Sequence, residues 1–302
     1  MKRDFLTLKD YSRDEIEYIV ELSEEIKKDK NKYSKVLEGN NIVMLFDKHS
    51  TRTRLSFEVG INQLGGNALI LDSKSLHLSR GETYMDTAKI FSLYADGVII
   101  RTFKQETVEI FAKYGTIPVI NGLTDTYHPC QVLADILTLK ELGLLSKELK
   151  FTYVGDSNNV TNSLIIGFSK LGIDITIGSP EKYSPPKEIL EYAYNQKEGI
   201  KINIVHNPEE AVKDADVVYT DVWLSMGDEM DNQKLKELES YQVNSDLLHH
   251  AKKEVKVMHC LPAHRGQEIT SEVLDGKNSV VFQQAENRIH AQKGLLVYLY
   301  KN

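Results

Sequence analysis

The chain has 302 residues, of which 41% are hydrophobic and 27% charged, a composition typical of globular proteins. This length exceeds the usual size of one hydrophobic core, so two domains are expected. The formal net charge of −7 gives a nucleic-acid backbone no general attraction. No apolar run approaches the roughly 18 residues of a membrane helix, and the first residues lack the apolar core of a signal peptide. We therefore expect a cytoplasmic protein without nucleic-acid or membrane partners.

In chain order, the first predicted element is an amphipathic helix over residues 12–29, with a capping box from Ser12 to Glu15. A nearly continuous apolar strand at 41–46 and a helix that begins at 50–53 follow it. Gly65 can end this helix in the left-handed conformation. Further apolar runs at 68–71, 97–100 and 117–120 alternate with helical patterns at 84–94 and 105–114. The first half therefore reads as repeated βαβ units with a parallel sheet.

A long helix is predicted at 129–142, and a second series of strands follows it. The predicted strands lie in the segments 149–156, 174–180, 201–207, 216–221, 255–260 and 279–282, with helices between them, and a final helix is expected at 285–300. This alternation predicts the α/β class, with two doubly wound parallel-sheet domains joined by interdomain helices. We expect domains at 1–140 and 141–285, with residues 286–302 packing back on the first.

The segment STRT, residues 50–53, has the features of a phosphate-binding loop. It lies between a buried strand and a helix, so the helix begins at hydroxyl side chains. The first backbone N–H groups of a helix have no internal partner, and the helix dipole is positive there. Arg52 adds a planar cation that fits two phosphate oxygens at once. The alternative is a capped helix with surface arginines, so the segment needs support from the rest of the chain.

That support comes from the ends of the other predicted strands. In open α/β sheets, ligands bind at the carboxyl ends of the strands. Polar or reactive residues follow most of these ends: Arg101, His128, Gln131, Asp156, Asn158, Asn159, Asp221, Cys260 and Arg288. We therefore expect a cleft between the domains that binds a charged small molecule. Cys130 and Cys260 are far apart and lack zinc-ligand spacing, so neither a disulfide nor a metal site is expected, and no cofactor.

Six motifs in order make the chain resemble the aspartate/ornithine carbamoyltransferase family, and most closely its ornithine-specific members. They are STRTRLSFE, HPCQVLAD, DSNNVTNSL, DVWLSMGDE, HCLPAHRG and AENR. The resemblance implies that residues 1–140 bind carbamoyl phosphate and residues 141–285 bind ornithine. It assigns carbamoyl phosphate to Ser50, Thr51, Arg52, Thr53, His77, Arg101, His128, Gln131, Cys260, Leu261 and Arg288. It further implies a homotrimer in which His77 completes a neighbour's site, although Ser79 stands where the family often has glycine.

For the second substrate, the resemblance assigns ornithine to Asn159, Asp221, Ser225 and Met226. The implied reaction is attack of the ornithine δ-amine on carbamoyl phosphate to give citrulline and phosphate, as in arginine biosynthesis. Arg101, His128, Asp221 and Cys260 are the catalytic candidates. Neutralising an amine with a pKa near 10.4 costs roughly 4 to 5 kcal/mol at pH 7, so the site must accept a proton. Asp221 and Cys260 both remain candidates for that role.

Several alternatives stay open. A nicotinamide dehydrogenase would need G-x-G-x-x-G after a strand, and only Gly155 is present in the segment concerned. A cysteine hydrolase built on Cys260 lacks an evident base. A non-enzymatic protein that binds carbamoyl phosphate is a third reading. Within the family, a putrescine carbamoyltransferase differs mainly at Asn159 and the SMG segment 225–227, which favour ornithine.

Overall fold

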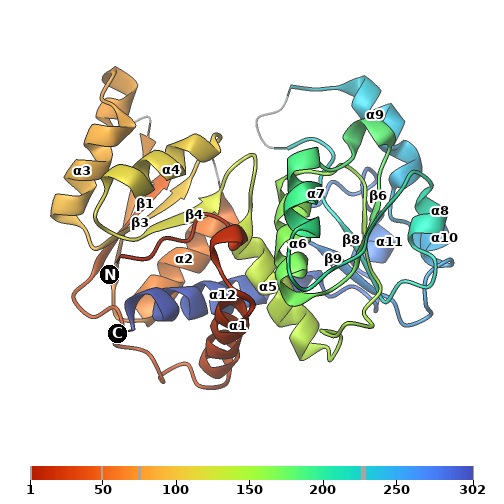
Figure 1. The fold of residues 1–302 in the computed structure, drawn as a ribbon, viewed down its shortest axis with the longest axis horizontal. Helices are drawn as coiled ribbons and strands as arrows, with labels where there is room; N and C mark the ends of the chain where they lie inside the picture. The colour runs from red at the N-terminus through yellow and green to blue at the C-terminus, as the bar shows by residue number, and fades with distance from the viewer. Residues whose placement is uncertain (1, 49, 74–75, 226–228, 302) are drawn as a thin grey trace. The chain divides into compact units, whose positions relative to one another are not determined.

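The computed structural model describes residues 2–48, 50–73, 76–225 and 229–301. The chain divides into two compact units, Met1–Leu137 with Asn287–Asn302 and Thr138–Glu286. Each unit contains one parallel sheet with helices on both faces (Figure 1). This confirms the predicted α/β class with two parallel sheets. No described helix is both long and apolar enough to cross a membrane.

The sheet of the first unit has the strand order β2-β1-β3-β4. Its strands are β1 (Asn41–Phe46), β2 (Asn67–Asp72), β3 (Gly97–Arg101) and β4 (Val119–Leu123). The helices are η1 (Leu8–Asp10), α1 (Arg13–Lys28), α2 (Thr51–Gln63), η3 (His77–Arg80), α3 (Tyr84–Tyr94), α4 (Gln105–Tyr114) and the start of α5 (Pro129–Glu141). Figure 1 shows α3 and α4 on one face of this sheet, and α2 with the last helix, α12 (Val281–Tyr300), on the other.

The sheet of the second unit has the order β7-β6-β5-β8-β9. Its strands are β5 (Phe151–Val154), β6 (Ile175–Gly178), β7 (Ile202–Val205), β8 (Val217–Thr220) and β9 (Lys256–His259). The helices are α6 (Asn159–Leu171), η4 (Glu181–Tyr183), α7 (Lys187–Tyr194), α8 (Pro208–Ala211), α9 (Asn232–Leu238), η5 (Glu239–Tyr241), α10 (Ser245–Leu248) and α11 (Ser271–Leu274). A core cluster joins β5, β8 and β9 to α10 and α11, while Phe168 of α6 packs edge-on against Phe151.

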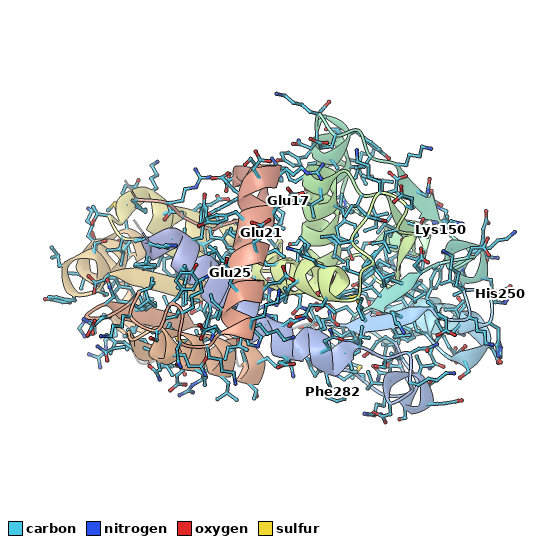
Figure 2. All side chains as sticks on the ribbon, turned by 90° about the horizontal axis from the view of Figure 1, so that it is seen from below. Glu17, Glu21, Glu25, Lys150, His250 and Phe282 are labelled. Carbon is cyan, nitrogen blue, oxygen red and sulfur yellow. The ribbon has the colours of Figure 1, made fainter. Side chains whose placement is uncertain are left out.

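Helix α1 illustrates how local sequence sets an element. Ser12 and Glu15 form the predicted capping box, since each accepts a hydrogen bond from the other's backbone N–H. Apolar side chains of α1 are buried on one face, and Figure 2 shows Glu17, Glu21 and Glu25 in a row along the helix. The spacing of four residues places these carboxylates on one face.

Two predicted strands are corrected by the structure. The run at 117–120 is displaced, because β4 covers Val119–Leu123 and includes the fully buried Asn121. The Asn121 amide donates to the backbone oxygen of Leu6 at 2.9 Å, so a polar residue is accommodated inside the sheet. The prediction of a strand at 279–282 is wrong, because α12 begins at Val281. Only Ser279 forms a bridge with β9, and a short apolar run does not distinguish a strand from the start of a buried helix.

The strand orders locate the edge of each sheet where a ligand is expected. In the first unit, connections run in opposite directions from β1 and β3, and in the second unit from β5 and β8. Loops leave each such pair toward opposite faces, which opens a crevice at the carboxyl ends of the two strands. Ligand-binding residues are therefore expected directly after β1 and β3 in the first unit, and after β5 and β8 in the second.

Candidate functional site

In the first unit, β1 leads into the N-terminus of α2. Ser50 is the N-cap, and its hydroxyl accepts a hydrogen bond from the backbone N–H of Thr53 at 3.1 Å. Thr51 and Arg52 occupy the first turn, where Thr51 is exposed and Arg52 half-buried. The helix therefore presents backbone N–H groups, hydroxyls and a cation together, which is the arrangement that binds an anion.

The end of β3 supplies a second cation to this helix terminus. Arg101 is the last residue of β3 and is only 9% exposed, and its Nη1 donates to Thr53 Oγ1 at 3.2 Å. β1 and β3 are neighbours in the sheet, so their adjacent ends bring together residues 48 positions apart. The hydroxyl of Thr53 thus fixes the guanidinium of Arg101 beside the phosphate-loop segment.

Helices α5 and α12 supply the remaining polar groups of the first unit. Gln131, in the first turn of α5, accepts a hydrogen bond at Oε1 from Arg288 Nη1 at 2.7 Å. His128 precedes α5 and is buried. Its pKa is held well below 6.5, first by burial and then by the positive charges of Arg288, Arg101 and Arg52. His128 is therefore a neutral imidazole among three guanidinium groups, a surrounding suited to a polyanion.

In the second unit, a carboxylate and a thiol meet at the ends of β8 and β9. Cys260 Sγ donates to Asp221 Oδ1 at 2.9 Å, and Asp221 is buried. Asn158 Nδ2 donates to Asp221 Oδ2 at 2.7 Å. The other end of the Asn158 amide caps α6, since Oδ1 accepts from the backbone N–H of Val160 at 2.9 Å. Both carboxylate oxygens of Asp221 are therefore oriented by neighbours from other strand ends.

The turn after β5 shows why the dehydrogenase alternative lacks a structural basis. Gly155 has a φ of +124°, and a Cβ added there would lie 3.2 Å from Trp223 Nε1. The conformation and the indole both favour glycine at this position. The close approach at Gly155 is to Trp223, a buried side chain of the same unit.

A buried histidine–carboxylate hydrogen bond supports the loop that carries Cys260 and Leu261. His259 and Glu268 are both fully buried, with His259 Nε2 3.0 Å from Glu268 Oε1. The other ring nitrogen, Nδ1, accepts from the backbone N–H of Leu261 at 2.8 Å, so the Nε2 nitrogen carries the proton and donates it to Glu268. Leu261 itself has a φ of +57°, an uncommon conformation for a side chain of this size. The pair thus holds the loop by its backbone.

Asp221, His259 and Cys260 also offer potential metal ligand atoms within 4.8 Å of one another. Tetrahedral zinc sites use such residue types. Here, however, both nitrogens of His259 are engaged by Glu268 and Leu261, and the Cys260 thiol donates to Asp221. The hydrogen bonds make this cluster a support for the Cys260 loop rather than a set of ligands aimed at one point.

Four more predicted residues are His77, Asn159, Ser225 and Met226. His77 is exposed on η3, and within the described residues no hydrogen bond joins its side chain to Ser50 or Arg101. Asn159 is the first residue of α6 and is half-buried, as is Ser225. Met226 lies outside the described residues. The sequence assigns ornithine to Asn159, and its neighbour Asn158 donates a hydrogen bond to Asp221.

Sequence reasoning also passed over Asp135 and Glu268, which hold predicted site residues in place. Gln131 Nε2 donates to Asp135 Oδ1 at 2.9 Å. A signal existed for Asp135, because the carboxylate lies four residues after Gln131 on the same predicted helix face. No comparable signal existed for Glu268, whose partner His259 belongs to a different element.

Comparison with known proteins agrees with the motifs and the fold. Residues 3–141 match the carbamoyl-P binding domain, and residues 147–299 the Asp/Orn binding domain, of the aspartate/ornithine carbamoyltransferases. The chain is 52% identical to an ornithine carbamoyltransferase of Oceanobacillus iheyensis, over 98% of this chain and 94% of that protein. It is 49% identical to one of Bacillus cereus, over 99% and 95%.

Solved structures give the same result. The ornithine carbamoyltransferase of Pyrococcus furiosus aligns with a TM-score of 0.94 and 47% identity, over 99% of this chain and 97% of that one. The anabolic ornithine carbamoyltransferase of Campylobacter jejuni aligns with a TM-score of 0.93 and 42% identity, over 99% of both chains. Full-length identity at this level, together with the two domain matches, places the chain in one family. The chain belongs to the aspartate/ornithine carbamoyltransferases.

Proposed function

We propose that this chain is an ornithine carbamoyltransferase, which transfers the carbamoyl group of carbamoyl phosphate to the δ-amine of L-ornithine and yields L-citrulline and phosphate. The observation that carries this proposal is that three guanidinium side chains, Arg288, Arg101 and Arg52, add to burial in lowering the pKa of His128, and that Arg101 and Arg288 bond to Thr53 and Gln131 of the same unit. This group suits a phosphate dianion. The names of the full-length relatives support the same activity. The anabolic relative from Campylobacter jejuni supports a role in arginine biosynthesis.

Carbamoyl phosphate is assigned to the first unit. Ser50, Thr51, Arg52 and Thr53 would bind the phosphate at the N-terminus of α2. Arg101 would span phosphate and carbonyl oxygen, and His128 and Thr53 would donate to the oxygen on which charge grows in the tetrahedral intermediate. A neutral His128 suits this role because it donates one N–H and remains uncharged when the phosphate leaves. Gln131 and Arg288 complete the set of the first unit, and Cys260 and Leu261, which the resemblance also assigns to this substrate, belong to the second unit.

Ornithine is assigned to the second unit. Asp221 would pair with an ammonium group of the substrate, and Asn159, Ser225 and Met226 would contact its amino-acid end. The Cys260 thiol donates to the Asp221 carboxylate, so the carboxylate is the hydrogen-bond acceptor of this pair. We therefore assign the proton from the attacking amine to Asp221 and an orienting role to Cys260.

We further propose a homotrimer in which His77 of one copy completes the site of its neighbour. The edge strand β2 and helix α2 support a second copy at this face, since Leu55 is 55% exposed and Leu69 is 44% exposed. A cavity of about 410 Å³ adjoins Ser50 and Thr51 between the ends of β1, β2 and α2. A long-lived subunit interface covers exposed apolar side chains such as these.

Subunit mixing tests the shared site. His77→Ala and Arg101→Ala proteins should each be nearly inactive, and co-refolded mixtures should regain activity in about one quarter of the sites of random trimers. Mixtures that stay inactive while forming trimers would show that His77 has no role in the neighbouring site.

A cytoplasmic location is also proposed, since Cys130 and Cys260 are present as thiols rather than as a disulfide.

The proposed activity is tested by citrulline formation from carbamoyl phosphate and ornithine, with carbamoylputrescine formation from putrescine as the parallel assay. Turnover with ornithine that collapses in Asp221→Ala supports both the substrate and the role of the second unit. A preference for putrescine would mean that the amine substrate is a diamine rather than ornithine. Binding of carbamoyl phosphate without turnover of either amine would favour a non-enzymatic binding protein.

A further inference from the structure

Asp135 is a buried carboxylate that the proposed reaction leaves without a role. It lies on α5 one turn after Gln131 and is 0% exposed. Among the described residues of the first unit, it is the one carboxylate classed as buried. A buried charge requires hydrogen-bonded or charged partners. Its Oδ1 accepts a hydrogen bond from Gln131 Nε2 at 2.9 Å.

The two ends of the Gln131 amide are therefore assigned to different partners. Nε2 donates to Asp135, whereas Oε1 accepts from Arg288 Nη1 at 2.7 Å. Because a carboxylate accepts and a guanidinium only donates, these two neighbours determine which end of the amide is nitrogen. The carbonyl oxygen of Gln131 keeps a second lone pair, so a ligand that reaches Oε1 meets a hydrogen-bond acceptor.

This orientation discriminates between the two parts of carbamoyl phosphate. A carbamoyl group carries an NH₂ donor, whereas a phosphate dianion presents acceptors only. An amide oxygen would attract the NH₂ group and repel a phosphate oxygen. The NH₂ end of an unanchored glutamine would instead donate hydrogen bonds to phosphate oxygens at the same place. The end of the amide that faces the ligand therefore decides whether Gln131 favours the carbamoyl group.

We propose that Asp135 is a positioning residue that fixes the Gln131 amide with its oxygen available to the carbamoyl NH₂ of the substrate. This inference rests on the proposed function, because Gln131 is placed in the carbamoyl phosphate site. Asp135 acts through Gln131 and touches no substrate atom. A competing explanation is that Asp135 only balances the positive charge of Arg288 and its neighbours, in which case its removal would change the affinity for every phosphate-bearing ligand equally.

Binding of two stable probes separates these explanations. Phosphonoacetamide carries a phosphonate and a carboxamide with an NH₂ group, and methylphosphonate carries the phosphonate alone. Calorimetry gives the dissociation constant of each probe for the parent protein and for Asp135→Ala, Asp135→Asn, Gln131→Ala and Asp135→Ala/Gln131→Ala. Cys130→Ala is the matched control, because it removes another buried hydrogen bond of α5, from Sγ to the Asn121 backbone oxygen at 3.3 Å.

The ratio of the two dissociation constants is the decisive quantity. We expect the preference for phosphonoacetamide to fall about tenfold in Asp135→Ala and to stay within about threefold of the parent in Asp135→Asn, whose Oδ1 still accepts from Nε2. In the Gln131→Ala background, Asp135→Ala should change the ratio no further. The Cys130→Ala ratio should match that of the parent.

Three results would overturn the inference. One is equal weakening or strengthening of both probes in Asp135→Ala. Another is an undiminished effect of Asp135→Ala without the Gln131 side chain. The third is a parent protein that shows no preference for phosphonoacetamide. A different outcome would contradict the proposed function alone: a parent protein that binds phosphonoacetamide with the expected preference and forms no citrulline. If Asp135→Ala does not fold, the ratios measured for Asp135→Asn and Gln131→Ala still test the inference. An Asp135→Asn protein that loses the preference for phosphonoacetamide would contradict the proposal that Asp135 fixes the Gln131 amide.

Discussion

Replacement of Asn158 by alanine should separate two tasks that this side chain performs. Oδ1 caps α6, and Nδ2 donates to Asp221 Oδ2 at 2.7 Å. Loss of an asparagine cap costs about 1 kcal/mol of stability. Loss of a hydrogen bond to a charged group costs about 1.5 to 3 kcal/mol, which corresponds to roughly a 10- to 150-fold fall in kcat/KM if Asp221 must be oriented for ornithine. We therefore expect a loss of stability that exceeds that of a cap alone, together with a large loss of activity.

Asn207→Ala is the matched control for the first task. Asn207 caps α8 in the same way, with Oδ1 accepting from the backbone N–H of Glu209 at 2.9 Å. Urea unfolding should give Asn207→Ala a loss of about 1 kcal/mol and Asn158→Ala a larger loss, because Asn158 also gives up its hydrogen bond to Asp221, and steady-state kinetics at varied ornithine should show a loss of activity in Asn158→Ala alone. Equal kcat/KM in the two variants would refute the view that Asn158 orients Asp221.

Asn158→Asp sharpens the same test, because aspartate caps a helix as well as asparagine does. The new carboxylate would face Asp221, and two unit charges about 4 Å apart repel by about 4 kcal/mol at an effective dielectric constant of 20. We expect this variant to lose at least as much activity as Asn158→Ala although its cap is retained. Parental kcat/KM in Asn158→Asp would show that the contact with Asp221 has no role in turnover.

Two further predictions concern buried histidines. Because the pKa of His128 is depressed in the native chain, the unfolded chain binds a proton below about pH 6.5 that the native chain does not. The free energy of unfolding should therefore fall with decreasing pH, by up to about 1.36 kcal/mol per pH unit more in the parent than in His128→Gln. Parallel pH profiles of the two proteins in urea titrations would contradict this. Glu268→Leu removes the acceptor of both His259 Nε2 and the backbone N–H of His264. Unfolding should become easier by about 2 to 6 kcal/mol and Glu268→Gln should recover most of that loss; a Leu variant as stable as the parent would show that neither donor needs this partner.

Local sequence was sufficient to predict the helices of the first half, the last helix and most strands. The capping box of α1, the start of α2 at Ser50 and the left-handed Gly65 after α2 depend on residues within one or two turns of each other. Hydrophobic periodicity located α3 and α4 at 84–94 and 105–114 for the same reason. The candidate residues at strand ends were also visible, because each follows directly on an apolar run.

The partner of each candidate residue depended on tertiary structure. Arg288 meets Gln131 across 157 positions, and Asn158 meets Asp221 across 63. Such pairs follow from the strand order, since β8 lies beside β5 and brings the ends of both strands to one edge of the sheet. Periodicity describes which face of an element is buried and carries no information about which element packs there. The sequence alone therefore determined the elements and the chemical types of the site residues, while only the folded chain decided which side chain orients which.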